Sequence, residues 1–170
     1  MNAEQLCLLQ HPLKEMYRSD PSAALITLRA QGRIGEGVTC NVETGRMLVQ
    51  AGLHPATGGT GFAACSGDML LQALVACAGV TLNAVATALG IQLRGGQLTA
   101  EGELDFRGTL GVDKEAPVGF KAIRLRIAVD SNAAPPDLEK LLRLTERYGV
   151  VYQTLRISPG LDVSIGADSG

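Results

Sequence analysis

The 170-residue chain contains no tryptophan and only three tyrosines and three phenylalanines. Its hydrophobic core must therefore be built mainly from aliphatic side chains. An excess of basic charge is also absent, because 15 Lys+Arg stand against 17 Asp+Glu and give a net charge of −2. This balance argues against a nucleic-acid partner bound by neutralising phosphates. With 46% hydrophobic residues, the composition predicts one compact domain rather than a disordered chain.

The four cysteines, at positions 7, 40, 65 and 77, form no CxxC pair and no dense disulfide framework. The first 18 residues lack the long apolar stretch of a secretory signal, because His11-Pro12 and charged residues interrupt them. We therefore expect free thiols in a cytoplasmic protein. No set of cysteines and histidines has zinc-site spacing, so we expect no metal and no cofactor.

A stretch of 25 residues between Asp68 and Arg94 carries no charge. It is long enough to span a membrane, but polar residues interrupt it and no basic cluster flanks its start, so we expect no membrane partner. The pattern instead predicts a buried helix over residues 67–90, with Ser66 as N-cap and Gly90 as its stop. A domain of this size rarely encloses so long a helix, which predicts a subunit interface along it.

Hydrophobic periodicity and turn residues predict the other elements. One or two short helical pieces should cover residues 4–18, with Pro12 beginning the second. A glycine-rich loop, residues 54–61, should precede the central helix, and a later helix should open at Pro135 and break at Gly149. Strands are expected over residues 24–33, 37–43, 46–52, 98–106, 123–129 and 161–165. This order is typical of one α+β domain.

Two cysteines are candidates for chemistry. Cys77 lies in the middle of the predicted helix, where a free cysteine is commonly an inert core residue. A reactive thiolate needs a positive neighbour or a helix N-terminus, so its activating group would have to come from another element or subunit. Cys65 stands at the helix entrance, where the dipole favours a thiolate. Twelve residues separate the two by roughly 18 Å, too far for a disulfide within one chain.

The helix SGDMLLQALVACAGVTLNAVA, the two alternating strands after it and the segment LTERYGVVYQTL resemble the OsmC/Ohr family. These names denote osmotically inducible protein C and organic hydroperoxide resistance protein. The similarity covers residues 24–165, and makes residues 1–20 an N-terminal helical extension of a domain over 21–170. The resemblance implies an OsmC-like α+β fold, with an antiparallel sheet around a long buried central helix, and an intertwined homodimer.

Peroxidases of this family reduce organic hydroperoxides with a helix cysteine that corresponds to Cys77. The resemblance also implies an arginine, best matched by Arg33 and second by Arg29, and an acid near the start of the helix. Here Gly67 holds the acid position and Asp68 follows it. The position of the resolving cysteine is Gly149, so the usual disulfide cannot form.

Two hypotheses follow from this resemblance. In the first, Arg33 and Asp68 hold the Cys77 thiolate, which reduces an organic hydroperoxide. An external dithiol, of the lipoyl type that serves the Ohr branch, or Cys65 of either chain would then resolve the oxidised sulfur. In the second, Gly149 marks a catalytically lapsed dimer that binds a small apolar ligand. The reactivity of Cys77 separates the two.

Overall fold

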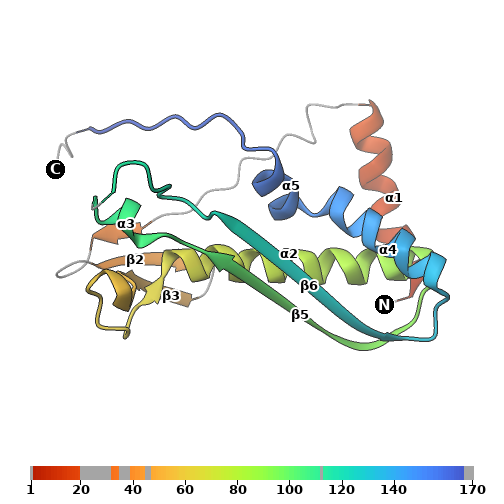
Figure 1. Cartoon of the computed structure of the whole chain (residues 1–170). Coiled ribbons are helices and arrows are strands. Elements are labelled where there is room, and N and C mark those ends of the chain that lie inside the picture. Colours follow the sequence, from red (N-terminus) through yellow and green to blue (C-terminus); the bar gives the residue numbers. More distant parts are fainter. Residues whose placement is uncertain (1, 20–31, 35–38, 45–46, 112, 167–170) are drawn as a thin grey trace.

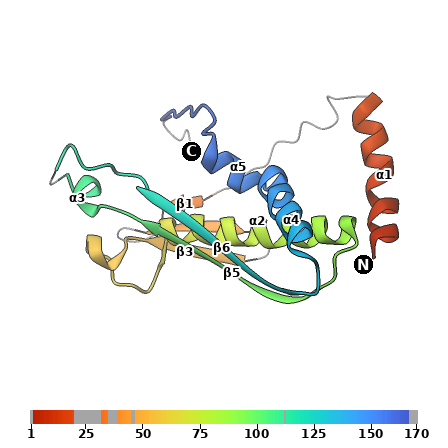
Figure 2. The ribbon, with the colours of Figure 1, turned by 45° about the vertical axis from the view of Figure 1, so that its right-hand side comes forward.

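A computed structural model of the chain describes residues 2–19, 32–34, 39–44, 47–111 and 113–166. Within these ranges one long helix, α2 (Ser66–Leu89), is in contact with β5, α4, α5, α1 and β4. Figures 1 and 2 show a long two-stranded ribbon running along α2, and a second helix crossing its C-terminal half. The helical elements besides α2 are α1 (Ala3–Ser19), the 3-10 turn η2 (Pro55–Thr57), α3 (Phe106–Thr109), α4 (Pro135–Tyr148) and α5 (Val150–Arg156).

The strands form two separate sheets. The first has the order β1-β2-β3-β4, and the second pairs β5 with β6 in antiparallel register. An antiparallel sheet was expected, but the first sheet is mixed. The short β4 runs parallel to β3 after the chain crosses back through residues 53–63. The strand bounds are β1 (Gly32–Ile34), β2 (Thr39–Thr44), β3 (Met47–Gly52), β4 (Ala64–Cys65), β5 (Leu93–Glu103) and β6 (Ala122–Ser131).

The ends of α2 follow from local backbone geometry. Gly90 ends the helix as predicted, in a left-handed conformation (φ 69°) in which its N–H reaches the carbonyls of Ala86 and Thr87. The predicted N-cap at Ser66 is wrong by one residue, because Cys65 still has the extended backbone of β4 and Ser66 is already helical. The side chain of Cys65 makes no capping hydrogen bond, so its thiol is not used by the helix.

The core lies on the C-terminal half of α2. Leu82, Val85 and Ala86 pack against Leu141 of α4, which is 1% exposed. Apolar residues of β5 and β6 cover this cluster from the side. As expected for a domain of this size, a single chain does not enclose the helix completely: β5, α4, α5, α1 and β4 contact it, and several of its residues stay exposed. The residues of α2 that are buried are Leu74, Ala78, Leu82, Val85 and Ala86.

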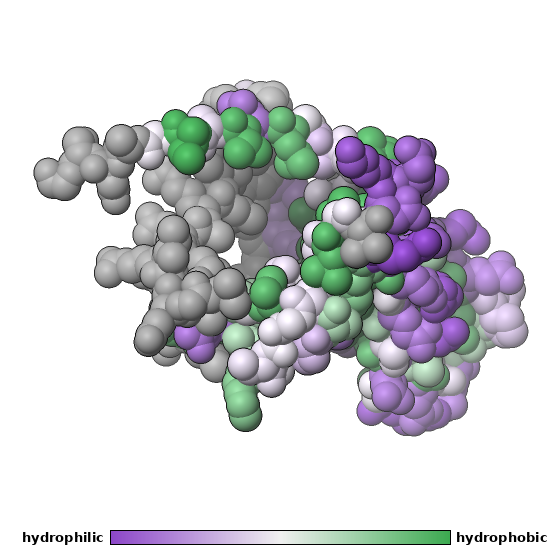
Figure 3. Space-filling model, turned by 60° about the vertical axis from the view of Figure 1, so that its left-hand side comes forward, coloured by the Kyte–Doolittle hydropathy of each residue, from purple (hydrophilic) through white to green (hydrophobic). Residues whose placement is uncertain are grey.

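Several predicted boundaries change in the structure. The strand expected over 98–106 begins earlier, at Leu93, and ends at Glu103, because the Asp105 side chain accepts a hydrogen bond from the Arg107 N–H and caps α3. The strand expected over 161–165 does not form. Those residues are extended but unpaired, and apolar side chains stand out along them (Figure 3).

The N-terminal prediction is also corrected. α1 is one continuous helix rather than two pieces beginning at Pro12. It starts with a reciprocal cap, in which the Asn2 side chain accepts from the Gln5 N–H and the Gln5 side chain accepts from the Asn2 N–H. Most of the expected strand over 24–33 lies outside the described residues.

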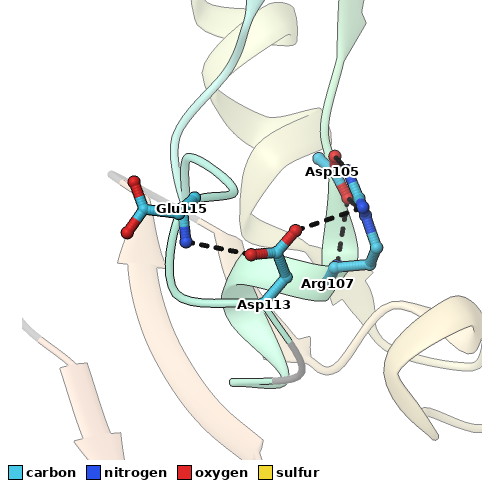
Figure 4. A network of polar contacts seen from close by, with 4 residues as sticks. All are labelled: Asp105, Arg107, Asp113 and Glu115. Carbon is cyan, nitrogen blue, oxygen red and sulfur yellow. Dashed lines mark hydrogen bonds and ion pairs between the residues drawn. The ribbon is translucent and has the colours of Figure 1, made fainter.

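An ion network fixes the connection between β5 and β6 (Figure 4). The guanidinium of Arg107 contacts Asp105 at 2.6 Å and Asp113 at 3.2 Å, and Asp113 also accepts from the Glu115 N–H at 3.0 Å. The hydrogen bond from Arg107 lowers the pKa of Asp105 to about 2. Stability from this carboxylate is therefore present above its ordinary pKa and is lost as the pH falls towards 2.

Truncating the central core leucine should destabilise the protein. Leu141→Ala is expected to lower the free energy of unfolding by about 2–4 kcal/mol, because it leaves a cavity against α2. Urea denaturation followed by circular dichroism measures this. Leu8→Ala, at a side chain 69% exposed on α1, is the control and should change the value by less than about 0.5 kcal/mol. Equal losses in the two variants would contradict this position of the core.

Removing the arginine from the ion network should restore the ordinary titration of its partner. In Arg107→Gln the pKa of Asp105 is expected to rise from about 2 towards the ordinary value of 3.8, because the charged donor is lost. Carboxyl-detected NMR across pH 1.5–6 measures the pKa of Asp105. Arg143→Gln, on α4, is the control and should leave the Asp105 titration unchanged; an unchanged midpoint in Arg107→Gln would show that another group sets it.

Candidate functional site

The sulfur of Cys77 lies between two helices that are far apart in sequence. The residue is partly buried near the middle of α2 and forms no disulfide. Its Sγ accepts a hydrogen bond from the backbone N–H of Val151, in the first turn of α5, at 3.5 Å. The polar neighbour of this thiol therefore comes from another element, as expected, although it is a backbone donor and not an arginine.

Gly149 places this donor. Its backbone (φ −73°, ψ 104°) leaves the helical region, so α4 ends there and α5 begins at the next residue. The N–H groups in the first turn of a helix have no acceptor within that helix, which leaves the Val151 N–H free for the sulfur. The predicted break at Gly149 is thus confirmed. A main-chain donor has no residue signature, and for that reason the sequence alone missed this contact.

Two other predicted site residues, Asp68 and Cys65, do not lie beside Cys77 within one chain. Asp68 lies in the first turn of α2 and Cys65 just before it, roughly 14 Å and 18 Å away from Cys77 along the helix axis. Arg33 lies on β1, where it pairs with Asn41 of β2, but its side chain is outside the described part of the structure. Arg29 is among the residues that the structure does not describe.

Cys65 instead borders a different cavity, the His54 hollow. Two adjoining cavities of about 340 and 330 Å³ share the residues that define this hollow, namely His54, Cys65, Gly67, Leu104, Phe106 and Phe120. The ring of His54 stacks on Phe106 with a centroid distance of 5.1 Å. Its Nδ1 accepts from the Ala56 N–H at 3.0 Å, so a neutral ring carries its proton on Nε2.

Gly67 keeps the His54 hollow open next to the thiol. A Cβ at this position would lie 3.4 Å from the Phe120 ring and 3.7 Å from the sulfur of Cys65. Sequence analysis did not find this grouping, because His54 is an isolated histidine before a glycine-rich loop, with no motif around it. The hollow is separate from the surroundings of Cys77.

A smaller cavity lies next to the α4–α5 break and is called here the Gly149 groove. Its volume is about 240 Å³, and Ala78, the residue after Cys77, forms part of its wall. The inward side chains of β6 make one side of the groove mainly aliphatic, and Tyr152 closes the end at α5. Its full lining is Ala78, Ile123, Leu125, Ile127, Leu142, Thr145, Glu146, Gly149 and Tyr152.

Solved structures with the same fold are known. An OsmC-like protein from Mycoplasma pneumoniae superposes with a TM-score of 0.65 at 16% identity, over 78% of this chain and 89% of that one. An organic hydroperoxide resistance protein OsmC from Legionella pneumophila gives 0.61 at 19% identity, over 78% and 91%. The organic hydroperoxide resistance protein OhrB of Bacillus subtilis gives 0.52 at 18% identity, over 78% and 93%.

These identities are low, so the superpositions show an α+β OsmC fold and no more. No curated protein matches in sequence. The sequence does match the family model for OsmC-like protein over residues 58–164, which include α2, both strands of the ribbon, α4 and α5. That match covers more than half of the chain and agrees with the fold. The chain therefore belongs to the OsmC-like protein family.

Proposed function

We propose that this OsmC-like protein is a thiol-dependent organic hydroperoxide reductase in which Cys77 reacts with the peroxide. The observation that carries the proposal is the position of the Cys77 sulfur, partly buried on an apolar helix and hydrogen-bonded by the Val151 N–H at 3.5 Å. In the proposal this donor stabilises the negative charge that the sulfur carries when it acts as the nucleophile. Similar structures that bear the name organic hydroperoxide resistance protein add support.

The proposed reaction oxidises the sulfur by two electrons. The Cys77 thiolate attacks one peroxide oxygen, an S–O bond forms, the O–O bond breaks, and the organic part leaves as an alcohol after taking up a proton. The product on the protein is a sulfenic acid. Arg33 and Asp68 are the charged residues that we propose to assist. Asp68 lies roughly 14 Å from Cys77 along the axis of their shared helix, so we propose that it acts from a second chain.

The second half-reaction needs a thiol from outside the Cys77 site. Gly149 has no side chain, and Cys65 of the same chain is roughly 18 Å away along α2. We propose that an external thiol condenses with the sulfenic acid, releasing water and forming a mixed disulfide. A second thiol, which in a dithiol of the lipoyl type belongs to the same molecule, then restores Cys77. Cys65 of a partner subunit is the other proposed resolving thiol.

We further propose that two chains pack along α2 as a homodimer. Only 22% of the most apolar part of this helix is buried in the single chain. Val80, 73% exposed, lies on the uncovered face with Ala73 and Ala76. Small side chains let two helices approach closely, and an exposed apolar face of this length is typical of an interface. The homodimer would shield this face from water.

A second function is favoured by one specific observation, the glycine at position 149. Without a thiol there, the protein would be a catalytically lapsed member of the family that keeps its dimer and binds a small apolar ligand. The aliphatic walls of the Gly149 groove fit such a ligand. In this alternative, Cys77 is an ordinary core thiol.

Reaction with one equivalent of cumene hydroperoxide distinguishes the two functions. Mass spectrometry of the reduced protein should find sulfenic acid, trapped with dimedone, at Cys77 well before it appears at the exposed Cys7. Cys77→Ser is the control and should consume no peroxide beyond the rate of an exposed thiol. If Cys77 is oxidised no faster than Cys7, the reductase proposal is wrong and the ligand-binding alternative gains weight.

The proposed dimer predicts a specific effect of charge on α2. Val80→Lys should shift the protein from dimer to monomer in sedimentation velocity, because the ammonium group would have to be buried between two helices. Thr99→Lys adds the same charge on an exposed position of β5 and is the matched control, expected to stay dimeric. A wild-type protein that sediments as a monomer would refute the homodimer.

A further inference from the structure

One side chain bridges the break between α4 and α5. The side-chain amide of Gln153 donates from Nε2 to the backbone carbonyl of Glu146 at 2.7 Å. Glu146 lies in the last turn of α4 and Gln153 in α5, so the bond joins the two helices across Gly149. Gln153 is partly buried, which protects this bond from competing water.

The bond satisfies a carbonyl that the helix itself leaves without a partner. The last four carbonyls of a helix receive no hydrogen bond from an N–H within that helix. At the end of α4 the Gly149 N–H donates to the Thr145 carbonyl at 2.9 Å, and the Gln153 side chain donates to the Glu146 carbonyl. The backbone N–H of Gln153 also donates to the Gly149 carbonyl at 2.9 Å. Gln153 therefore makes two hydrogen bonds at the α4–α5 junction, one from its main chain and one from its side chain.

This bond sets where the donor to Cys77 lies. α5 has only seven residues, and a helix so short is not stable in isolation. Its orientation must come from contacts with its surroundings, and Gln153 provides a polar anchor two residues after Val151. The N–H of Val151 is 3.5 Å from the Cys77 sulfur, so a small displacement of α5 would end that hydrogen bond.

We propose that Gln153 is a positioning residue for Cys77. It acts through the Val151 N–H and does not touch the sulfur itself in the contacts described. The inference rests on the proposed function in treating Cys77 as the reacting thiol. A purely structural role for Gln153 would leave the reactivity of Cys77 unchanged. The positioning role predicts that substituting Gln153 changes this reactivity, although Gln153 does not contact the sulfur.

The test replaces the amide with a side chain of similar length that cannot donate. Gln153→Met is compared with Gln97→Met, at an exposed position of β5, in a background where Cys7, Cys40 and Cys65 are serine. The rate of alkylation of Cys77 by iodoacetamide is measured from pH 5 to 10. For Gln153→Met we expect the midpoint of this pH–rate profile to move to higher pH, with a rate at pH 7 lower by about 5-fold. Gln97→Met should follow the parent profile.

Alkylation, not peroxide reduction, is the readout, so the two proposals fail separately. A Gln153→Met profile that superimposes on the parent profile overturns the positioning role, whatever the peroxide result. A displaced profile in a protein that does not reduce cumene hydroperoxide supports the positioning role and overturns the reductase. Circular dichroism checks folding. If the methionine variant does not fold, Gln153→Asn, which keeps the amide but shortens its reach, takes its place with the same expected displacement.

Discussion

The burial of a 24-residue apolar helix is the constraint on which this structure depends. Apolar surface is favourable only when it leaves water, and a chain of 170 residues has few elements with which to cover such a helix. The β5–β6 ribbon and α4 cover one face of α2, and the core around Leu141 forms there. The uncovered face is the physical basis of the proposed homodimer.

The same helix separates the two cysteines that chemistry could use. Cys65 lies at the end of β4 next to the His54 hollow, and Cys77 lies where α5 meets α2. A straight helix is rigid over this distance, so the two thiols stand in different environments and cannot exchange partners within one chain. The proposed reaction at Cys77 and the His54 hollow beside Cys65 therefore lie at separate places in one chain.

The sequence predicted best those parts that glycine and helical periodicity determine. Gly90 and Gly149 end their helices where expected, because each occupies a backbone position that the helix cannot continue through. The strand ends were less well predicted. Alternation continues through Phe106, but the side chain of Asp105 competes for the backbone and starts α3. Alternation over 161–165 likewise predicted a strand, but these residues pair with no strand among the described residues.

The candidate site shows the same division. The family resemblance pointed to Cys77 and to an activating arginine; the structure places a main-chain N–H beside the sulfur, a donor that no residue type reveals. The bracing by Gln153 depends on two helix ends meeting across Gly149, which is a property of the fold and not of local sequence. The side chain of Arg33 lies outside the described residues, so its predicted role stays a prediction.

The glycine at position 149 also bears on the kinetics of the proposed cycle. A resolving cysteine within the same protein reacts at a high effective molarity, so its rate does not depend on the supply of thiol. With Gly149 the sulfenic acid would wait for a collision, and its lifetime would lengthen as the concentration of reductant falls. A second peroxide could then carry the sulfur to sulfinic acid, which thiols do not reduce. Such a protein would turn over only where the thiol reductant is plentiful. It would be inactivated where peroxide remains after the thiol is used up.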